Sequence, residues 1–200
     1  MPRSLPIALD AYLNDLFPAD QMRRPTLLGE WGGHWSDNEP WVMRGELRTG
    51  CWLQAVTPYA GNTGFWWWLW LETSDQWKQY AAVARFMQGE ERSGQTWTPI
   101  QPRVLGADTR LFAQGMMSPT AVRLYVWPRG FDQDSRRTQP KASGMIRLDG
   151  LTPGVWRMRR VDGATGEQVA ERELTADAQG RLDLPVSALD PDAVFKLDRR

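Results

Sequence analysis

Cysteine and histidine are almost absent from this sequence of 200 residues, which contains one of each. A single cysteine, Cys51, cannot form an internal disulfide and cannot build a cysteine-based zinc site. It lies in a segment with helical spacing, and we interpret it as a core side chain. Phosphate-binding, dinucleotide-binding, zinc-protease and nucleophile-elbow motifs are also missing, so we expect no cofactor and no metal.

Neither a net charge nor a long apolar run is present. The 24 basic and 24 acidic residues give a formal charge of zero, unlike the one-signed field of proteins that bind nucleic acid or anionic membranes. The longest apolar run, residues 65–71, is far shorter than the roughly 20 residues that span a bilayer. The first residues show no apolar segment typical of a secretory signal. We therefore expect no nucleic acid and no membrane as partner.

Tryptophan, by contrast, is abundant. There are 12 tryptophans, and nine of them lie between Trp31 and Trp77. An indole ring has a broad apolar face and one N–H donor, which suits the C–H faces and hydroxyl groups of a sugar ring. The same residues could equally form an aromatic core, and composition alone leaves both interpretations open.

The first ninety residues have the pattern of an α/β protein. Apolar spacing predicts helices over residues 7–17, 40–56 and 76–88. Short continuous apolar runs at residues 25–30 and 65–70 predict strands that are buried on both faces. The alternation of helix and strand is typical of a parallel α/β unit.

The pattern changes after residue 90. Residues 90–102 are rich in Gly, Thr, Pro, Ser and Gln, which predicts a linker or a domain boundary. A period of two then predicts strands over residues 111–116, 121–127, 143–148, 154–160, 168–174 and 193–197. We therefore predict an α/β domain over residues 1–92 and a small antiparallel β-sandwich over residues 93–200.

Two segments resemble a known group of enzymes. Residues 25–33 read Pro-Thr-Leu-Leu-Gly-Glu-Trp-Gly-Gly, and residues 64–68 read Gly-Phe-Trp-Trp-Trp. They resemble barrel strands seven and eight of family-5-like, clan-A-type glycoside hydrolases, whose catalytic carboxylates end strands four and seven. Residues 77–89 are similar to the terminal barrel helix of these proteins, and residues 148–197 to the β-sandwich that follows it in many of them. The resemblance implies that residues 1–92 are an incomplete (β/α)8 TIM-barrel segment.

The resemblance also implies a site. It makes Glu30 the catalytic nucleophile, in agreement with its place at the C-terminal end of a predicted barrel strand. In a barrel of this kind, the residues of the following loop and of the second strand would bind the substrate: Trp31, His34, Trp35, Trp66, Trp67 and Trp68. Alternation along a strand would place Trp66 and Trp68 on one side and Trp67 on the other. Leu69 stands where family members often carry Asp.

Much of such a barrel is missing from this sequence. A closed barrel has eight strands and about 250 residues, and only two barrel strands are predicted. Retaining hydrolysis also needs a second carboxyl group about 5–5.5 Å from the nucleophile. We therefore predict a C-terminal part of a retaining glycoside hydrolase that acts on poly- or oligosaccharide. It would be inactive until a second chain or a further N-terminal segment supplies the rest.

Other interpretations stay open at this point. The chain could be a non-catalytic carbohydrate-binding or assembly protein that uses the β-sandwich and exposed tryptophans. It could also be a structural interaction protein whose aromatic face docks on another chain. If the hydrolase interpretation holds, the resemblance implies a secreted or periplasmic parent enzyme.

Overall fold

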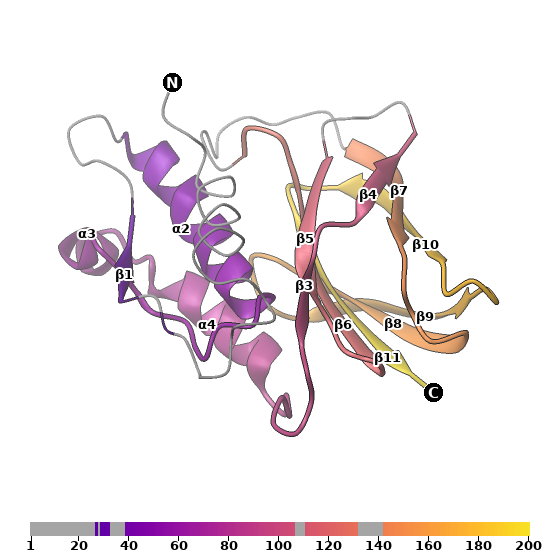
Figure 1. The fold of residues 1–200 in the computed structure, drawn as a ribbon. Coiled ribbons are helices and arrows are strands. Elements are labelled where there is room, and N and C mark those ends of the chain that lie inside the picture. Colours follow the sequence, from indigo (N-terminus) through magenta and orange to yellow (C-terminus); the bar gives the residue numbers. More distant parts are fainter. Residues whose placement is uncertain (1–26, 28, 33–38, 107–110, 132–141) are drawn as a thin grey trace.

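The structure is a computed structural model, and it describes residues 27, 29–32, 39–106, 111–131 and 142–200. The described elements form three layers: helices, a six-stranded sheet and a three-stranded sheet (Figure 1). The predicted helix over residues 7–17 and most of the predicted strand over residues 25–30 lie outside the described residues. Most of the described regular structure is β-sheet.

Two of the predicted helices are confirmed. Helix α2 (Pro40–Ala55) begins at a proline, whose fixed φ and missing N–H suit a first helical turn. Helix α4 (Trp77–Met87) buries Ala82, Val83 and Phe86 on one face. Strand β1 (Glu30–Trp31) and strand β2 (Gly64–Phe65) pair in parallel, as the alternating pattern predicts. Each of these strands is only two residues long.

The predicted strand over residues 65–70 is wrong beyond Phe65. The chain leaves β2 there and forms the short helix α3 (Trp68–Thr73). In this helix Leu71 is buried, whereas Trp68 and Leu69 are exposed. A short apolar run does not by itself distinguish a strand from a helix, and here only one side of the run finds a core to pack against.

Two antiparallel sheets form the rest of the described chain. Their strand orders are β3-β5-β6-β11-β8-β9 and β10-β7-β4, and all six strands predicted after residue 90 are present. The bounds are β3 (Thr98–Ile100), β4 (Arg103–Leu105), β5 (Leu111–Met117), β6 (Ala121–Pro128), β7 (Ala142–Leu148), β8 (Gly154–Asp162), β9 (Gln168–Ala176), β10 (Leu182–Leu189) and β11 (Ala193–Arg199).

Three strands, β3, β4 and β10, were not predicted from the sequence, and two of them contain proline. Pro185 lies in β10 and Pro99 in β3, and both strands are at the edge of their sheet, where a missing N–H is tolerated. The predicted linker over residues 90–102 contains β3, and β4 follows it directly. The polar and turn-forming composition of these segments is therefore the reason why the sequence pattern did not predict these edge strands.

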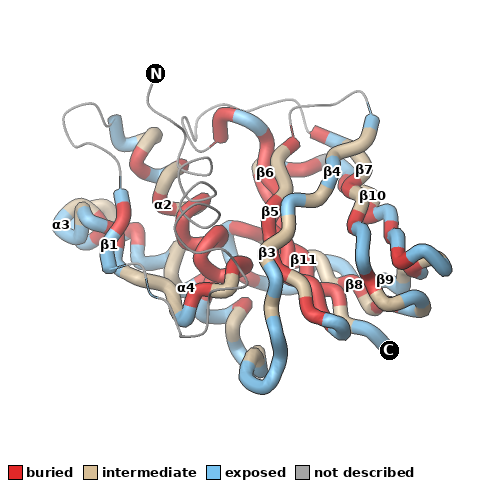
Figure 2. Tube along the Cα trace, viewed as in Figure 1, coloured by how far each residue is buried: buried red, intermediate tan, exposed pale blue. Residues whose placement is uncertain are grey.

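The centre of the six-stranded sheet is covered on both faces, whereas its edge strand β9 is mostly exposed. Tyr125 and Trp127 of β6 pack against α2 and α4, whereas Leu124 and Val126 pack against the three-stranded sheet. Every residue of β6 is buried, and Figure 2 shows this strand at the centre of the molecule. Cys51 is also buried, in the helical core, which confirms its interpretation as a core side chain.

Ion pairs connect the helical layer to the six-stranded sheet. Arg48 of α2 contacts Asp192 with two N–H groups, at 2.8 and 2.5 Å. Beyond the end of α4, the Glu90 carboxylate lies 2.7 Å from Arg123 of β6 and 2.6 Å from Lys196 of β11. Arg123 and Lys196 face each other across β6 and β11, and the Glu90 carboxylate together with Asp198, which lies 2.9 Å from Arg123, offsets the repulsion between these two like charges.

Candidate functional site

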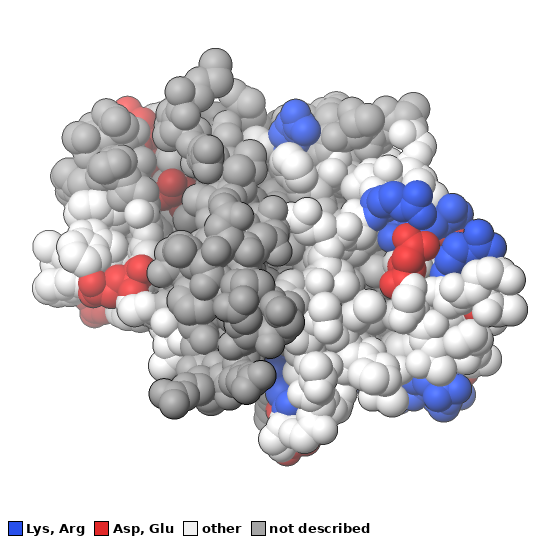
Figure 3. All heavy atoms as spheres, in the orientation of Figure 1, with Lys and Arg blue, Asp and Glu red and all other residues white. Residues whose placement is uncertain are grey.

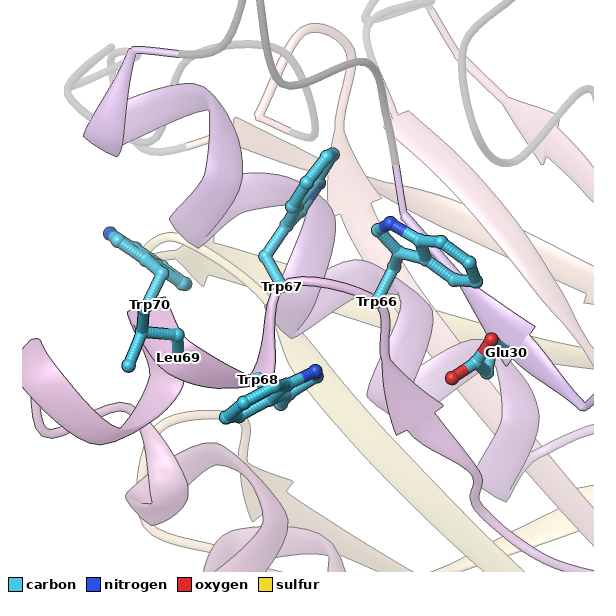
Figure 4. Close-up of a pocket in the computed structure, with 6 residues that line it drawn as sticks. All are labelled: Glu30, Trp66, Trp67, Trp68, Leu69 and Trp70. Carbon is cyan, nitrogen blue, oxygen red and sulfur yellow. The ribbon is translucent and has the colours of Figure 1, made fainter.

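Glu30 and four tryptophans line one hollow. Its volume is about 430 Å³, and its walls come from β1, the end of β2 and α3: Glu30, Trp66, Trp67, Trp68, Leu69 and Trp70. Figure 4 shows the Glu30 carboxylate directed toward Trp66 and Trp68. The parallel pairing of β1 and β2 creates this arrangement, because it sets Glu30 beside Gly64, two residues before Trp66. The structure thus brings together four of the residues that the sequence marks as a site.

Trp66 and Trp68 are both exposed in the hollow. Their exposed fractions are 52% and 67%, which is high for indole side chains. Trp67 is half-buried and packs against the helical core. All three tryptophans line the same hollow, and a turn into α3 places them there, so the alternation expected of a continuous strand does not apply to them.

Trp31 belongs to the core and not to the surface of the site. Its exposed fraction is 6%, and its ring lies edge-on to Phe65 at 4.9 Å between centroids. Gly50 of α2 makes room for it, since a Cβ at that position would lie 2.1 Å from the Trp31 ring. The Trp31 indole N–H donates to the Thr63 carbonyl at 3.0 Å. These contacts leave the ring no free face, which corrects the expectation that Trp31 binds substrate.

His34 and Trp35 lie outside the described residues, so their predicted substrate contacts stay predictions. Among the residues that line the hollow, Glu30 is the one acid. Within the described part of the chain, no three acidic, histidine or cysteine side chains are close enough to hold a metal ion. The hollow therefore offers one carboxylate and an aromatic wall.

Tyr80 also lies in this region. The sequence pattern predicts only that it forms part of one face of a helix. Its hydroxyl lies 2.8 Å from the Phe65 N–H and 3.1 Å from the Thr63 carbonyl. Burial, followed by the neighbouring Cys51 thiol, raises the pKa of Tyr80, so the hydroxyl keeps its proton. No spacing rule links Tyr80 to β2, because this contact exists only once α4 packs against the strand.

Several exposed charges outside the hollow form ion pairs. In the view of Figure 3, Lys and Arg side chains gather at the sheet end of the molecule, with acidic side chains among them. On the three-stranded sheet, Arg147 contacts Asp183 at 2.8 Å and Arg103 contacts Asp149 at 3.1 Å. In the described part of the chain, no helix is long and apolar enough to cross a membrane.

Comparison with known proteins gives a likeness of fold alone. No known protein family and no curated protein matches the sequence. The chain is similar to a crystal structure of a glycoside hydrolase family 5 from Bacteroides vulgatus, with a TM-score of 0.50 and 12% identity. A GH39 enzyme from Xanthomonas axonopodis pv. citri gives a TM-score of 0.38 and 12% identity.

The matches cover nearly all of this chain but less than half of the other proteins. The alignments include 95% and 96% of this chain, against 45% and 49% of the two hydrolases. Over that part of its length, the family 5 structure has a fold similar to this one. At the level of fold, this likeness agrees with the resemblance that the sequence motifs carry.

Proposed function

We propose that this chain carries one half of the active site of a retaining glycoside hydrolase that acts on poly- or oligosaccharide. The observation that supports this most is the Glu30 carboxylate facing the exposed rings of Trp66 and Trp68 in one open hollow (Figure 4). The likeness of fold to a family 5 hydrolase supports the same class of substrate.

In this proposal the tryptophans hold the sugar and Glu30 attacks it. The apolar C–H face of a sugar ring would stack on Trp66 or Trp68 while its hydroxyl groups stay in water. A Glu30 carboxylate oxygen would bond to the anomeric carbon as the bond from that carbon to the leaving oxygen breaks. A carboxylic acid normally gives the leaving oxygen its proton, and water later releases the sugar from Glu30.

The second carboxyl group has no candidate in the hollow. Gly64 is the neighbour of Glu30 across the strand pair, and the other residues that line the hollow are apolar. The chain by itself would therefore bind sugar and carry the nucleophile but not cleave ordinary glycosides. Another polypeptide segment would supply the acid/base carboxyl group.

An activated glycoside tests Glu30 without that missing acid. A dinitrophenyl 2-deoxy-2-fluoroglycoside has a leaving group that departs without protonation, so a nucleophile alone can form the covalent ester. We expect release of dinitrophenolate and a single glycosyl adduct on Glu30 by mass spectrometry. Glu30→Gln should give no adduct. The matched variant Glu72→Gln, of an exposed acid outside the hollow, should label like the unchanged chain.

A non-catalytic carbohydrate-binding protein is the second candidate. The single carboxylate and the exposed Trp66 and Trp68 favour it as a function of the isolated chain. Its binding face would be this hollow and not the sheets, because Trp127 and Trp156 of the sheets are buried. Sugar binding without any adduct on Glu30 would support this candidate over the first.

Sugar binding itself is tested at Trp68. We expect Trp68→Ala to weaken binding of cello-, xylo- or manno-oligosaccharides about fivefold in calorimetry, since a lost aromatic stack is worth about 1 kcal/mol. Trp77→Ala is the matched control, because Trp77 is 47% exposed but does not line the hollow. Equal effects of the two substitutions would contradict a sugar site at Glu30.

A further inference from the structure

The walls of the hollow are apolar and carry charge of one sign. They come from β1, the residues just after β2, and α3. Residues 30–31 and 64–73 together contain two acids, Glu30 and Glu72, and no lysine, arginine or histidine. In the view of Figure 3, the end of the molecule that holds α3 shows acidic side chains and no Lys or Arg among the described residues. The hollow therefore favours a positively charged ligand over a negatively charged one.

The exposed indole rings add to this preference for a cation. Trp66 and Trp68 are 52% and 67% exposed, and Figure 4 shows the Glu30 carboxylate directed toward both. The face of an aromatic ring is negative, and tryptophan attracts a cation more strongly than the other aromatic side chains do. Aromatic rings of this kind are what proteins use to bind alkylammonium groups. Glu30 and the two rings thus form a place for a positively charged group.

A neutral sugar would use only part of this site. Its C–H face stacks on an indole ring while its hydroxyl groups stay in water. A sugar that carries an ammonium group can stack in the same way and can also contact the Glu30 carboxylate. A carboxylate that attacks the anomeric carbon lies next to the substituent on the neighbouring ring carbon. In a 2-amino-2-deoxy sugar, that substituent is the amino group.

We propose that the glycan that binds in this hollow contains 2-amino-2-deoxy sugar units with free amino groups. This inference rests on the proposed function, because that function makes the hollow a sugar site. The protonated amino group would contact the Glu30 carboxylate, and the C–H face of a sugar ring would stack on Trp66 or Trp68. An acetylated amino group carries no charge and an acidic sugar would be repelled by Glu30, so glycans of these two kinds should bind more weakly.

Two oligosaccharides of equal length test this preference, tetraglucosamine and cellotetraose. They share the same linkage and differ only in an ammonium group in place of one hydroxyl group on each ring. At about pH 5.5, model carboxylic acids are ionised and model amines are protonated. In calorimetry we expect tetraglucosamine to bind at least about fivefold more tightly, since an exposed ion pair and an exposed cation–π contact each add a modest factor. The difference should shrink in added salt. Equal binding, or tighter binding of cellotetraose, would overturn the inference.

Glu30→Gln separates the carboxylate from the aromatic wall. It keeps the shape of the side chain and removes the charge, so the ratio of the two dissociation constants should fall to about one. Glu173→Gln is the matched control, because Glu173 is an exposed acid of β9, 2.6 Å from Arg200, and this variant should keep the ratio. Tetralysine is the control ligand, with a similar charge and no sugar ring, and it should bind far more weakly. A ratio that survives Glu30→Gln, or tetralysine that binds as tightly as tetraglucosamine, would also overturn the inference.

The outcomes keep this inference apart from the proposed function. Binding of cellotetraose without a preference for tetraglucosamine would leave the sugar site standing and remove only the amino sugar. A preference for tetraglucosamine without a glycosyl adduct on Glu30 would support the amino sugar and contradict the role of Glu30 as nucleophile. If neither oligosaccharide binds, both proposals are wrong.

Discussion

Asp192 is the residue whose loss we expect to destabilise the protein most clearly. Its side chain is fully buried where α2 meets the six-stranded sheet. It accepts two N–H groups of Arg48, at 2.8 and 2.5 Å, and the hydroxyl of Tyr125 at 2.8 Å. In the seam between the helices and the six-stranded sheet, three hydrogen-bond donors therefore share one carboxylate as their acceptor.

The substitution Asp192→Asn keeps the shape of the side chain and removes its charge. Burial disfavours the charge on Arg48, but Asp192 outweighs burial and the pKa of Arg48 is raised. An arginine cannot lose its proton near neutral pH, so the variant leaves a buried and unpaired charge. Breaking a buried ion pair in this way costs about 3–5 kcal/mol, against a total stability of about 5–15 kcal/mol for a typical domain.

Urea unfolding followed by tryptophan fluorescence measures this cost, because Trp52 and Trp127 lie in the same seam. Asp183→Asn is the matched control: Asp183 contacts Arg147 at 2.8 Å, with side chains 42% and 30% exposed. We expect the control to lose less than about 1 kcal/mol. If Asp192→Asn loses no more than Asp183→Asn, the argument that the buried pair stabilises this seam is wrong.

Two further predictions concern the same helical layer. Burial tends to raise the pKa of Glu90, but Arg123 and Lys196 together outweigh burial, and the folded-state pKa is lowered. Its stabilisation is therefore complete above the unfolded-state pKa of about 4.3 and is lost as the pH falls through the folded-state value. Glu90→Gln should shrink the difference in unfolding free energy between about pH 6 and about pH 3, and an unchanged difference would contradict this. Gly50→Ala would set a Cβ 2.1 Å from the Trp31 ring and should lower the free energy of unfolding in urea by about 2 kcal/mol or more. Gly64→Ala is the control, because a Cβ there would have no atom within 4 Å, and it should lower the free energy of unfolding by less. Equal losses of unfolding free energy in the two variants would refute the packing argument.

The sequence by itself determined the elements whose side chains repeat with a clear period. Helices α2 and α4 and six of the strands follow from apolar spacing, because one face of each must reach a core. The parallel pairing of β1 and β2 also followed from the alternation of helices and strands. The motifs around Glu30 and Trp66 marked the place where the structure forms an open hollow.

Tertiary structure alone decided the role of each aromatic residue. Trp31 follows the apolar run at residues 25–30 and Trp66 lies in the run at residues 65–70, yet Trp31 is buried because Gly50 on a distant helix leaves space for its ring. The run at residues 65–70 turns into helix α3 because only one of its sides meets a core.

The polar contacts between layers were equally invisible in the sequence. The partner of Arg48 lies 144 positions away, and the partner of the Phe65 N–H is a tyrosine on a later helix. Periodicity reports which face of an element is apolar, but it does not report which element that face will meet. The hydrogen bonds of the Thr63 and Phe65 N–H groups therefore follow from the packing of α2 and α4 and not from the motif that contains these two residues.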